Sequence, residues 1–168
     1  MGVSTRTRAT AQQRVADAGT PWPAKNTVWL LDVNVLLALL DPVHPHHALA
    51  HAWFADAGAA WASCNITQNG AMRIMAHPRY GNAVASAVIA AELLADLCRQ
   101  PGHVYWPSDL SLLDSPLIDG SRLLASDQVT DTYLLALAVH HGGRLATFDK
   151  RLVTSAVRGG EAARFVIG

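Results

Sequence analysis

The chain has few charged residues and few cysteines. Charged residues make up 15% of its 168 residues, the formal net charge is zero, and the two cysteines are Cys64 and Cys98. Two cysteines without a CxxC pair exclude a disulfide framework, and they are typical of small buried residues in a reducing cytoplasm, where we expect this protein. The neutral charge is also at odds with the broad basic surface of many nucleic-acid-binding proteins.

Long apolar runs are also missing. No stretch approaches the roughly 20 apolar residues of a membrane helix, and residues 1–26 lack the apolar core of a secretion signal, so we expect no membrane association. Residues 1–26 are polar, contain four basic residues and one acidic one, and end in Thr20-Pro21-Trp22-Pro23. We interpret them as a loosely ordered extension with a short helix around 9–18, which leaves residues 27–168 as one domain.

Within this domain, short apolar segments alternate with helical ones. We expect strands at 28–31, 60–64, 103–106, 145–147 and 165–167. We expect helices at 35–40, 46–57, 68–76, 83–99 and 131–141, with Thr67 and Thr130 as N-caps of the third and the last. This alternation predicts an α/β domain with a mostly parallel sheet.

Three aspartates occupy equivalent places in this pattern. Asp32 and Asp149 each follow an apolar strand, and Asp131 lies in the first turn of a helix. Ligands of parallel sheets bind beyond the carboxyl ends of the strands, so the three carboxylates can share one edge. Each also has a simpler interpretation: Asp32 as a helix cap, Asp131 as a favourable charge at a helix N-terminus, and Asp149 as a cap or an ion-pair partner of Lys150 or Arg151.

Taken together, the three aspartates favour a metal site. Carboxylates packed side by side repel each other unless a cation lies among them. Oxygen-only ligands suit Mg²⁺, with Mn²⁺ as a substitute, rather than zinc. Such a metal polarises a phosphate and activates a water for attack on it. We therefore expect Asp32, Asp131 and Asp149 to be both metal ligands and catalytic residues.

Six segments of the chain resemble the PIN-domain ribonucleases, and among them the VapC toxins of bacterial toxin–antitoxin pairs. The resemblance spans about residues 28–168, and its short motifs are specific through their order and spacing. The segments are Leu30–Leu39, Pro45-His46-His47, Ala52-Trp53-Phe54, Thr67-Gln68-Asn69-Gly70, Val129–Ala138 and Leu145–Asp149.

This resemblance implies a PIN-like α/β/α sandwich and a magnesium-dependent endoribonuclease. It also implies a homodimer and a cognate VapB-type antitoxin that neutralises the toxin. The family's metal ligands correspond to Asp32 and Asp131, with Asp149 as the third acidic residue. The sequence departs from the family in one place: many PIN domains carry a glutamate on the helix after the second strand, where this chain has Thr67-Gln68-Asn69-Gly70. With one acid fewer, the site should hold one Mg²⁺ more readily than two.

Several polar residues near these motifs are candidates for contacts with the substrate or for positioning the aspartates. Asn34 and Thr147 neighbour the aspartates and can orient them. Gln68 or Asn69 can supply a neutral oxygen in place of the missing acid. Arg73, on the same predicted helix, suits a phosphate, although an ordinary surface arginine is an equally good interpretation.

The histidines are a weaker indication of a metal. His47 and His51 have the spacing of a helical zinc pair, but no glutamate or cysteine completes the set, so we expect exposed histidines rather than zinc there. His140 and His141 end a predicted helix, where a positive charge is favourable.

Two other functions stay open at this point. A magnesium-dependent phosphatase would need a second acid two residues after the nucleophilic aspartate, and Asp32 is followed by Val33-Asn34. A non-catalytic binding module with the same fold is supported by the missing glutamate, whereas three retained aspartates favour a working site.

Overall fold

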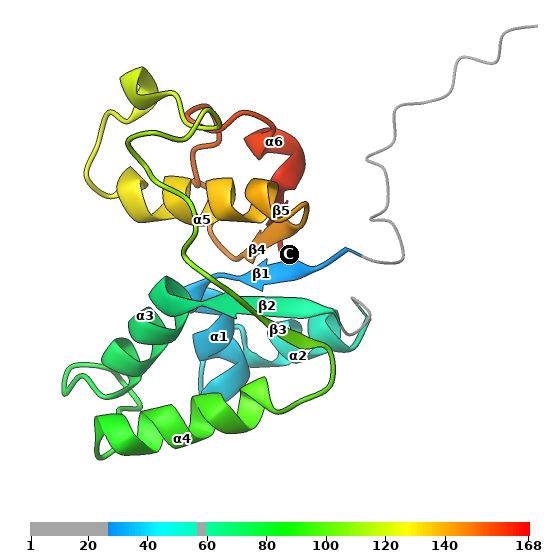
Figure 1. Cartoon of the computed structure of the whole chain (residues 1–168). Coiled ribbons are helices and arrows are strands. Elements are labelled where there is room, and N and C mark those ends of the chain that lie inside the picture. The colour runs from blue at the N-terminus through cyan, green and yellow to red at the C-terminus, as the bar shows by residue number, and fades with distance from the viewer. Residues whose placement is uncertain (1–26, 57–59) are drawn as a thin grey trace, which may run out of the picture.

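The computed structural model describes residues 27–56 and 60–168, and Figure 1 shows a central sheet with helices on both sides. The interpretation of residues 1–26 lies outside the described residues. The five strands are β1 (Trp29–Leu31), β2 (Trp61–Cys64), β3 (His103–Trp106), β4 (Arg144–Thr147) and β5 (Arg164–Val166). They form one sheet in the order β3-β2-β1-β4-β5, and all neighbouring strands are parallel. The predicted α/β domain with a mostly parallel sheet is therefore confirmed.

The helices form two layers. Helices α1 (Val33–Leu40), α2 (His47–Asp56), α3 (Asn65–Met75) and α4 (Ala87–Cys98) lie on one side of the sheet, and α5 (Gln128–His140) and α6 (Gly160–Ala163) lie on the other (Figure 1). Side chains alternate across β1, since Trp29 and Leu31 pack with α1 and α2 while Leu30 packs with α5. The result is the expected α/β/α sandwich. Within the part of the chain that the structure describes, no helix is both long and apolar enough to cross a membrane.

Two predicted helix caps were wrong. Helix α3 begins at Asn65 with Cys64 at its N-cap, and Thr67 lies inside its first turn, where its Oγ1 accepts a hydrogen bond from the Cys64 backbone N–H at 3.0 Å. Helix α5 begins at Gln128, so Thr130 is its third residue rather than its cap. Thr67 therefore satisfies the first turn of α3 from within the helix instead of from the residue before it.

One further helix prediction needs correction. The long helix predicted from residue 83 begins only at Ala87, because Ser86 is extended and its hydroxyl caps the backbone N–H of Ile89 at 3.3 Å. The short helix α6 lies between β4 and β5, where the alternation of strands and helices predicts a last helix without giving its bounds. A 3₁₀ turn at Gly120–Arg122 also lies in the segment between β3 and α5.

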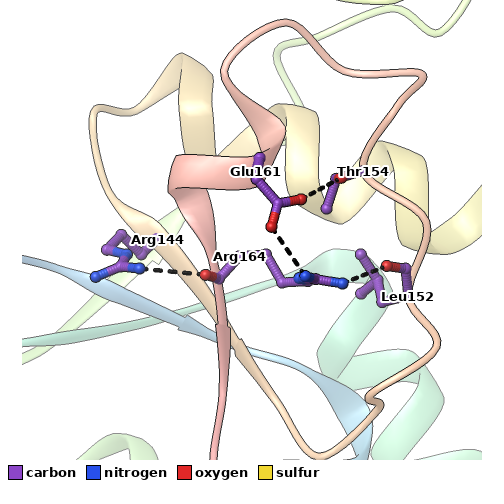
Figure 2. A network of polar contacts seen from close by, with 5 residues as sticks. All are labelled: Arg144, Leu152, Thr154, Glu161 and Arg164. Carbon is purple, nitrogen blue, oxygen red and sulfur yellow. Dashed lines mark hydrogen bonds and ion pairs between the residues drawn. The ribbon is translucent and has the colours of Figure 1, made fainter. Parts of the chain in front are cut away.

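Arg164 anchors the chain that follows β4 (Figure 2). Its guanidinium donates to the Leu152 carbonyl and to Glu161 Oε1, both at 3.0 Å, and Thr154 Oγ1 donates to Glu161 Oε2 at 2.7 Å. Arg144 in turn donates to the Arg164 carbonyl at 3.2 Å. These contacts hold the loop after Asp149 against β5 and so limit how far the end of β4 can move.

The strand order places the carboxyl ends of β1 and β4 side by side. From β1 the chain moves outward to β2 and β3 and then returns to the other side of β1 as β4. This reversal between β1 and β4 is the position at which parallel sheets bind their ligands. Asp32 follows β1 directly, and Asp149 follows β4 by two residues.

Candidate metal centre

Asp32 is a charged side chain held almost out of solvent at the end of β1. It is 8% exposed, and its backbone N–H donates to the Ala146 carbonyl of β4 at 3.0 Å. One carboxylate oxygen accepts the Val33 backbone N–H at 2.6 Å, so Asp32 caps helix α1, as its simpler interpretation proposed. This bond uses only Oδ1, and the second oxygen is held by other residues.

Asn34 and Thr147 orient that second oxygen. Asp32 Oδ2 accepts hydrogen bonds from Thr147 Oγ1 at 2.6 Å and from Asn34 Nδ2 at 2.7 Å. Asn34 also donates to Thr147 Oγ1 at 2.9 Å, and its carbonyl oxygen accepts the Phe148 backbone N–H at 3.1 Å. Both residues therefore stand next to Asp32, and they fix its carboxylate from a helix and a strand that are far apart in sequence.

Despite these hydrogen bonds, the surroundings of Asp32 disfavour its ionised form. Burial raises the pKa of Asp32 above its usual value, and the charge of Asp149 adds to this rise. The hydrogen bonds from Thr147, Val33 and Asn34 offset only part of it. A buried carboxylate with this balance gains from a nearby positive charge.

Asp131 faces the same place from helix α5. Burial, together with the charges of Asp32, Asp149 and Asp127, raises the pKa of Asp131 to about 6. Asp127, which was not predicted as part of this group, is the N-cap residue of α5, and its side chain makes no capping hydrogen bond. Its spacing of one helical turn from Asp131 was the available signal, and the misplaced helix start obscured it.

Asp149, two residues after β4, is joined to this group through Thr147. Its backbone N–H donates to Thr147 Oγ1 at 3.0 Å, and its Oδ1 accepts the Arg151 backbone N–H at 2.7 Å. It thus closes a local turn while its charge acts on both Asp32 and Asp131. The ion pairs found among the described residues do not include Asp149, so the predicted alternative partnership with the side chains of Lys150 or Arg151 was wrong.

A cleft of about 750 Å³ opens in front of these carboxylates. Asp32 and Asp131 line it on one side, and helix α3 lines it on the other with Gln68, Asn69 and Arg73. The structure therefore brings every predicted site residue to one edge of the sheet. Asn34 and Thr147 donate to Asp32, Asp149 donates to Thr147, and none of these three lines the cleft. Roles in catalysis or metal binding remain predictions for all of them.

Glycine allows α3 to approach α1 closely at this cleft. A Cβ on Gly70 would lie 2.6 Å from Val33 Cγ2, so any larger residue would push α3 away from the helix that Asp32 caps. The polar wall of the cleft is therefore held near the carboxylates by the absence of a side chain.

The donor set fits Mg²⁺. It consists of carboxylate oxygens with amide oxygens nearby, which are the ligands of a hard divalent cation. Burial first, and then the charges of the neighbouring acids, raise the pKa values of Asp32 and Asp131, and a bound cation would favour their ionised forms.

Comparison with known proteins places this arrangement in a family. The chain matches the PIN domain family over residues 29–157. It is 50% identical over 131 residues to Ribonuclease VapC44 of Mycobacterium tuberculosis, covering 77% of this chain and 92% of that protein. It is 40% identical to Ribonuclease VapC39 of the same organism, covering 77% and 94%.

The chain belongs to the VapC group of PIN-domain proteins. A crystal structure of the M. tuberculosis toxin VapC20, whose title describes it as cleaving the sarcin-ricin loop, aligns with a TM-score of 0.56 and 14% identity, over 77% of this chain and 96% of that one. At this identity the likeness supports the PIN fold alone.

In this PIN domain, the place of the missing glutamate is taken by amides. Gln68 Nε2 donates to Ser63 Oγ at 2.9 Å, which leaves its amide oxygen as the group available to the cleft. Asn69 is exposed beside it. The side of the cleft formed by Gln68, Asn69 and Arg73 of α3, here called the α3 wall, therefore offers a cation neutral amide oxygens and no carboxylate.

Proposed function

We propose that this chain is a magnesium-dependent endoribonuclease and the toxic component of a type II toxin–antitoxin pair. The observation that carries the proposal is the convergence of Asp32 and Asp131 on one cleft, with Asp149 acting on both. Membership of the VapC group and the names of its relatives as ribonucleases support the same activity. A phosphatase is not proposed, because the second acid that its nucleophile would need is absent.

Asp32, Asp131 and Asp149 are the residues that would hold Mg²⁺, or Mn²⁺ in its place. When bound there, the cation would stabilise charge on the phosphate and lower the pKa of a water molecule for attack on the phosphodiester. Thr147 and Asn34 hold Asp32 in one orientation, which keeps the ligand arrangement from rearranging as charge develops.

The α3 wall would position the RNA. Arg73 is exposed, lies two turns along α3 from Asn65, and lines the same cleft as Asp32. A guanidinium there can bind a backbone phosphate next to the scissile one through two hydrogen bonds. Such a local contact fits a chain without net charge, because the grip on RNA would come from the cleft rather than from a broad basic surface.

The proposed partners are a VapB-type antitoxin and a second copy of the chain. Helix α4 exposes three large apolar side chains, Val88 at 66%, Ile89 at 38% and Leu93 at 37%, and an apolar surface of this kind is typical of a face that a partner covers. Both RNA and an antitoxin are met in the cytoplasm, where we expect the chain to act.

The test uses the purified full chain, free of antitoxin, with total RNA in Mg²⁺ and in EDTA. We expect cleavage only with the metal, and a loss of about 100-fold or more in Asp131→Asn, since removing a ligand should exceed the 10–100-fold typical of outer-shell partners. The matched control is Asp96→Asn, an equal change of charge on the exposed side of α4, which should cleave like the wild type.

Metal-independent cleavage, or an Asp131→Asn variant as active as the wild type, would refute the proposal. A chain that binds Mg²⁺ and RNA but cleaves neither total RNA nor ribosomal RNA would instead be the binding module considered above. Isothermal titration with Mg²⁺ separates these outcomes, because it reads the metal site without any substrate.

A further inference from the structure

A second group of metal-binding side chains lies at the other end of helix α5. His140 is the last residue of the helix, and His141 is its C-cap. Both lie close to Asp109, which belongs to the loop after β3. Asp109 Oδ1 lies 3.1 Å from His141 Nε2 and 3.7 Å from His140 Nε2. It is the one group of three metal-binding side chains that the described residues bring within 4.8 Å of one another. Ten residues of helix, about 15 Å, separate it from Asp131.

The ring of His141 is held in place for this contact. It stacks on Trp106 with the ring centroids 4.6 Å apart and an angle of 13° between the planes, and it is only 20% exposed. Trp106 is itself buried at the end of β3. Since the stacking fixes the ring plane, the approach of Nε2 to Asp109 does not depend on a freely rotating surface side chain.

The distances from Asp109 to the two imidazoles suit a transition metal. Zinc binds imidazole nitrogen and carboxylate oxygen at about 2.0–2.2 Å with tetrahedral geometry, which sets the ligand atoms about 3.3 Å apart. The two distances to Asp109 Oδ1, 3.1 and 3.7 Å, lie on either side of this value. His140 and Asp109 are 43% and 42% exposed, so both can adjust by rotation and leave a position open to water.

A pocket of about 300 Å³ adjoins the cluster and contains a further acid. Asp109, His140 and Asp114 all line it. Asp114 accepts a hydrogen bond from Ser111 Oγ at 3.4 Å and is not one of the three ligating side chains. Two imidazoles and one carboxylate form a mixed nitrogen and oxygen set, unlike the oxygen-only set of the aspartate centre.

The other histidine pair shows why this cluster stands out. His47 and His51 have the i, i+4 spacing of a zinc pair, and their ring centroids are 4.4 Å apart. However, His47 Nδ1 donates to the Ala38 carbonyl at 2.8 Å and His51 Nε2 contacts the Leu39 carbonyl at 3.1 Å. No acid completes that pair among the described residues.

We propose that Asp109, His140 and His141 form a second metal site, which takes Zn²⁺ or a similar transition-metal cation. The site would tie the loop after β3 to the C-terminus of α5. Its existence does not depend on the proposed ribonuclease activity, because none of its ligands faces the cleft of the aspartate centre.

The test is a titration of the full chain, without a histidine tag, by Co²⁺ monitored by visible absorption. The protein carries Asp131→Asn and is kept in excess Mg²⁺, so that the aspartate centre does not compete. We expect one equivalent of Co²⁺ with ligand-field bands, displaced by Zn²⁺. In the same background, His140→Gln and Asp109→Asn should each weaken binding by about tenfold or more. The matched control is His51→Gln, which removes a histidine from the other pair and should bind like its parent.

Circular dichroism and thermal unfolding establish that each variant is folded, and Zn²⁺ should raise the midpoint of the parent but not of His140→Gln. The proposal is overturned if Co²⁺ does not bind, or if His140→Gln and Asp109→Asn bind it as tightly as His51→Gln. In that case the three side chains form only an ion pair at the end of a helix. Neither result bears on RNA cleavage, so this proposal and the ribonuclease proposal fail separately.

Discussion

Helix α1 has a nearly buried aspartate at each end, and the two carboxyl groups are perturbed in opposite directions. Asp32, before the helix, is 8% exposed, and burial together with the charge of Asp149 raises its pKa. Asp41, after the helix, is 5% exposed. Although its burial alone would raise the pKa of Asp41, hydrogen bonds led by those from Tyr80 and Asn82 lower it below its usual value.

The neighbours of the two aspartates explain the difference. Asp41 accepts hydrogen bonds from Tyr80 Oη at 2.7 Å, Asn82 Nδ2 at 2.8 Å and the Val43 backbone N–H at 3.0 Å, and it ties the segment after α3 to the end of α1. Asp32 also accepts three hydrogen bonds, but it shares its surroundings with two other acids. Burial of an aspartate therefore does not by itself favour a metal site, and the metal site proposed at Asp32 rests on the other acids around it.

The largest expected effect is a loss of RNA cleavage when Asp32, at the N-terminal end of α1, is replaced. Asp32→Asn should lower RNA cleavage by about 100-fold or more, because it removes a ligand and its charge from the proposed centre. Single-turnover cleavage in saturating Mg²⁺ measures this. If Asp41→Asn, assayed at a temperature where it is folded, lost as much activity, the two aspartates would not differ in the way proposed.

The next largest effect is a loss of folding stability when Asp41, at the C-terminal end of α1, is replaced. Asp41→Asn places an amide N–H₂ opposite donors, so it should lower the free energy of unfolding by about 2–3 kcal/mol. Tyr80→Phe, which removes one of the donors, should cost about 1 kcal/mol. Urea denaturation at pH 7 measures both. Since the folded-state pKa of Asp41 is lowered, its contribution is present above pH 4 and should be lost as the pH falls below the usual value of 3.8.

Thr147 gives a finer test of how Asp32 is held. Thr147→Val removes the hydroxyl that donates to Asp32 Oδ2 while keeping the shape of the side chain. We expect Mg²⁺ affinity to fall by about tenfold, as is typical when the partner of a metal ligand is lost. Thr132→Val is the matched control, because Thr132 is equally buried, on α5, and should leave Mg²⁺ affinity unchanged. Equal Mg²⁺ affinity in wild type and Thr147→Val would show that the hydroxyl is structural only.

The metal-free protein should show the cost of the Asp131 charge, which comes first from burial and then from the neighbouring acids. Because the pKa of Asp131 is about 6 in the folded chain and near 3.8 when unfolded, the folded state holds the extra proton between these values. Its contribution to stability therefore falls as pH rises through that window. Asp131→Asn should be more stable than wild type in EDTA at pH 7 by about 1 kcal/mol, a value reduced for partial exposure, and equal to it near pH 4.

Excess Mg²⁺ should reverse the order of these two proteins at pH 7, since only the wild type keeps all of its ligands. Thermal unfolding at several pH values, with and without Mg²⁺, measures this. A pH-independent difference between the two proteins would argue against the ionisation of Asp131 as its cause.

The smallest effect is expected at Asp127. Its charge acts on Asp131, but its side chain is exposed at the start of α5. Asp127→Asn should weaken Mg²⁺ binding about two- to threefold, which is the size of a screened interaction near the surface. A loss as large as that of Asp131→Asn, measured by the same titration, would instead make Asp127 a ligand in place of the missing glutamate.

The sequence was sufficient for the parts of the site that follow from strand order. Asp32 and Asp149 were found because each ends an apolar segment, and parallel strands bring such ends to one edge. The two layers of helices followed from the alternation of strands and helices. Helix starts were less predictable, because the alanine-rich residues before Ser86 favour a helix as strongly as those after it, and only the hydroxyl of Ser86 ends that ambiguity.

Contacts between distant residues could not be predicted from local patterns. Asp41 precedes a proline and looked like an ordinary helix end, because its partner Tyr80 lies 39 residues away. His141 was interpreted as a favourable charge at a helix C-terminus, and its contact with Asp109 spans 32 residues. In each case the geometry depends on how a loop packs, which no local preference determines.

The hydrogen bond from Thr147 to Asp32 spans 115 residues and has a consequence for the order in which the protein is made. At synthesis rates of about 5–20 residues per second, the ribosome adds Thr147 roughly 6–23 s after Asp32. During that interval the growing chain contains β1 but has neither β4 nor the third carboxylate. The proposed metal centre therefore cannot be complete until Asp149 has been added and β4 has paired with β1, so the activity proposed for this chain would begin only near the end of its synthesis.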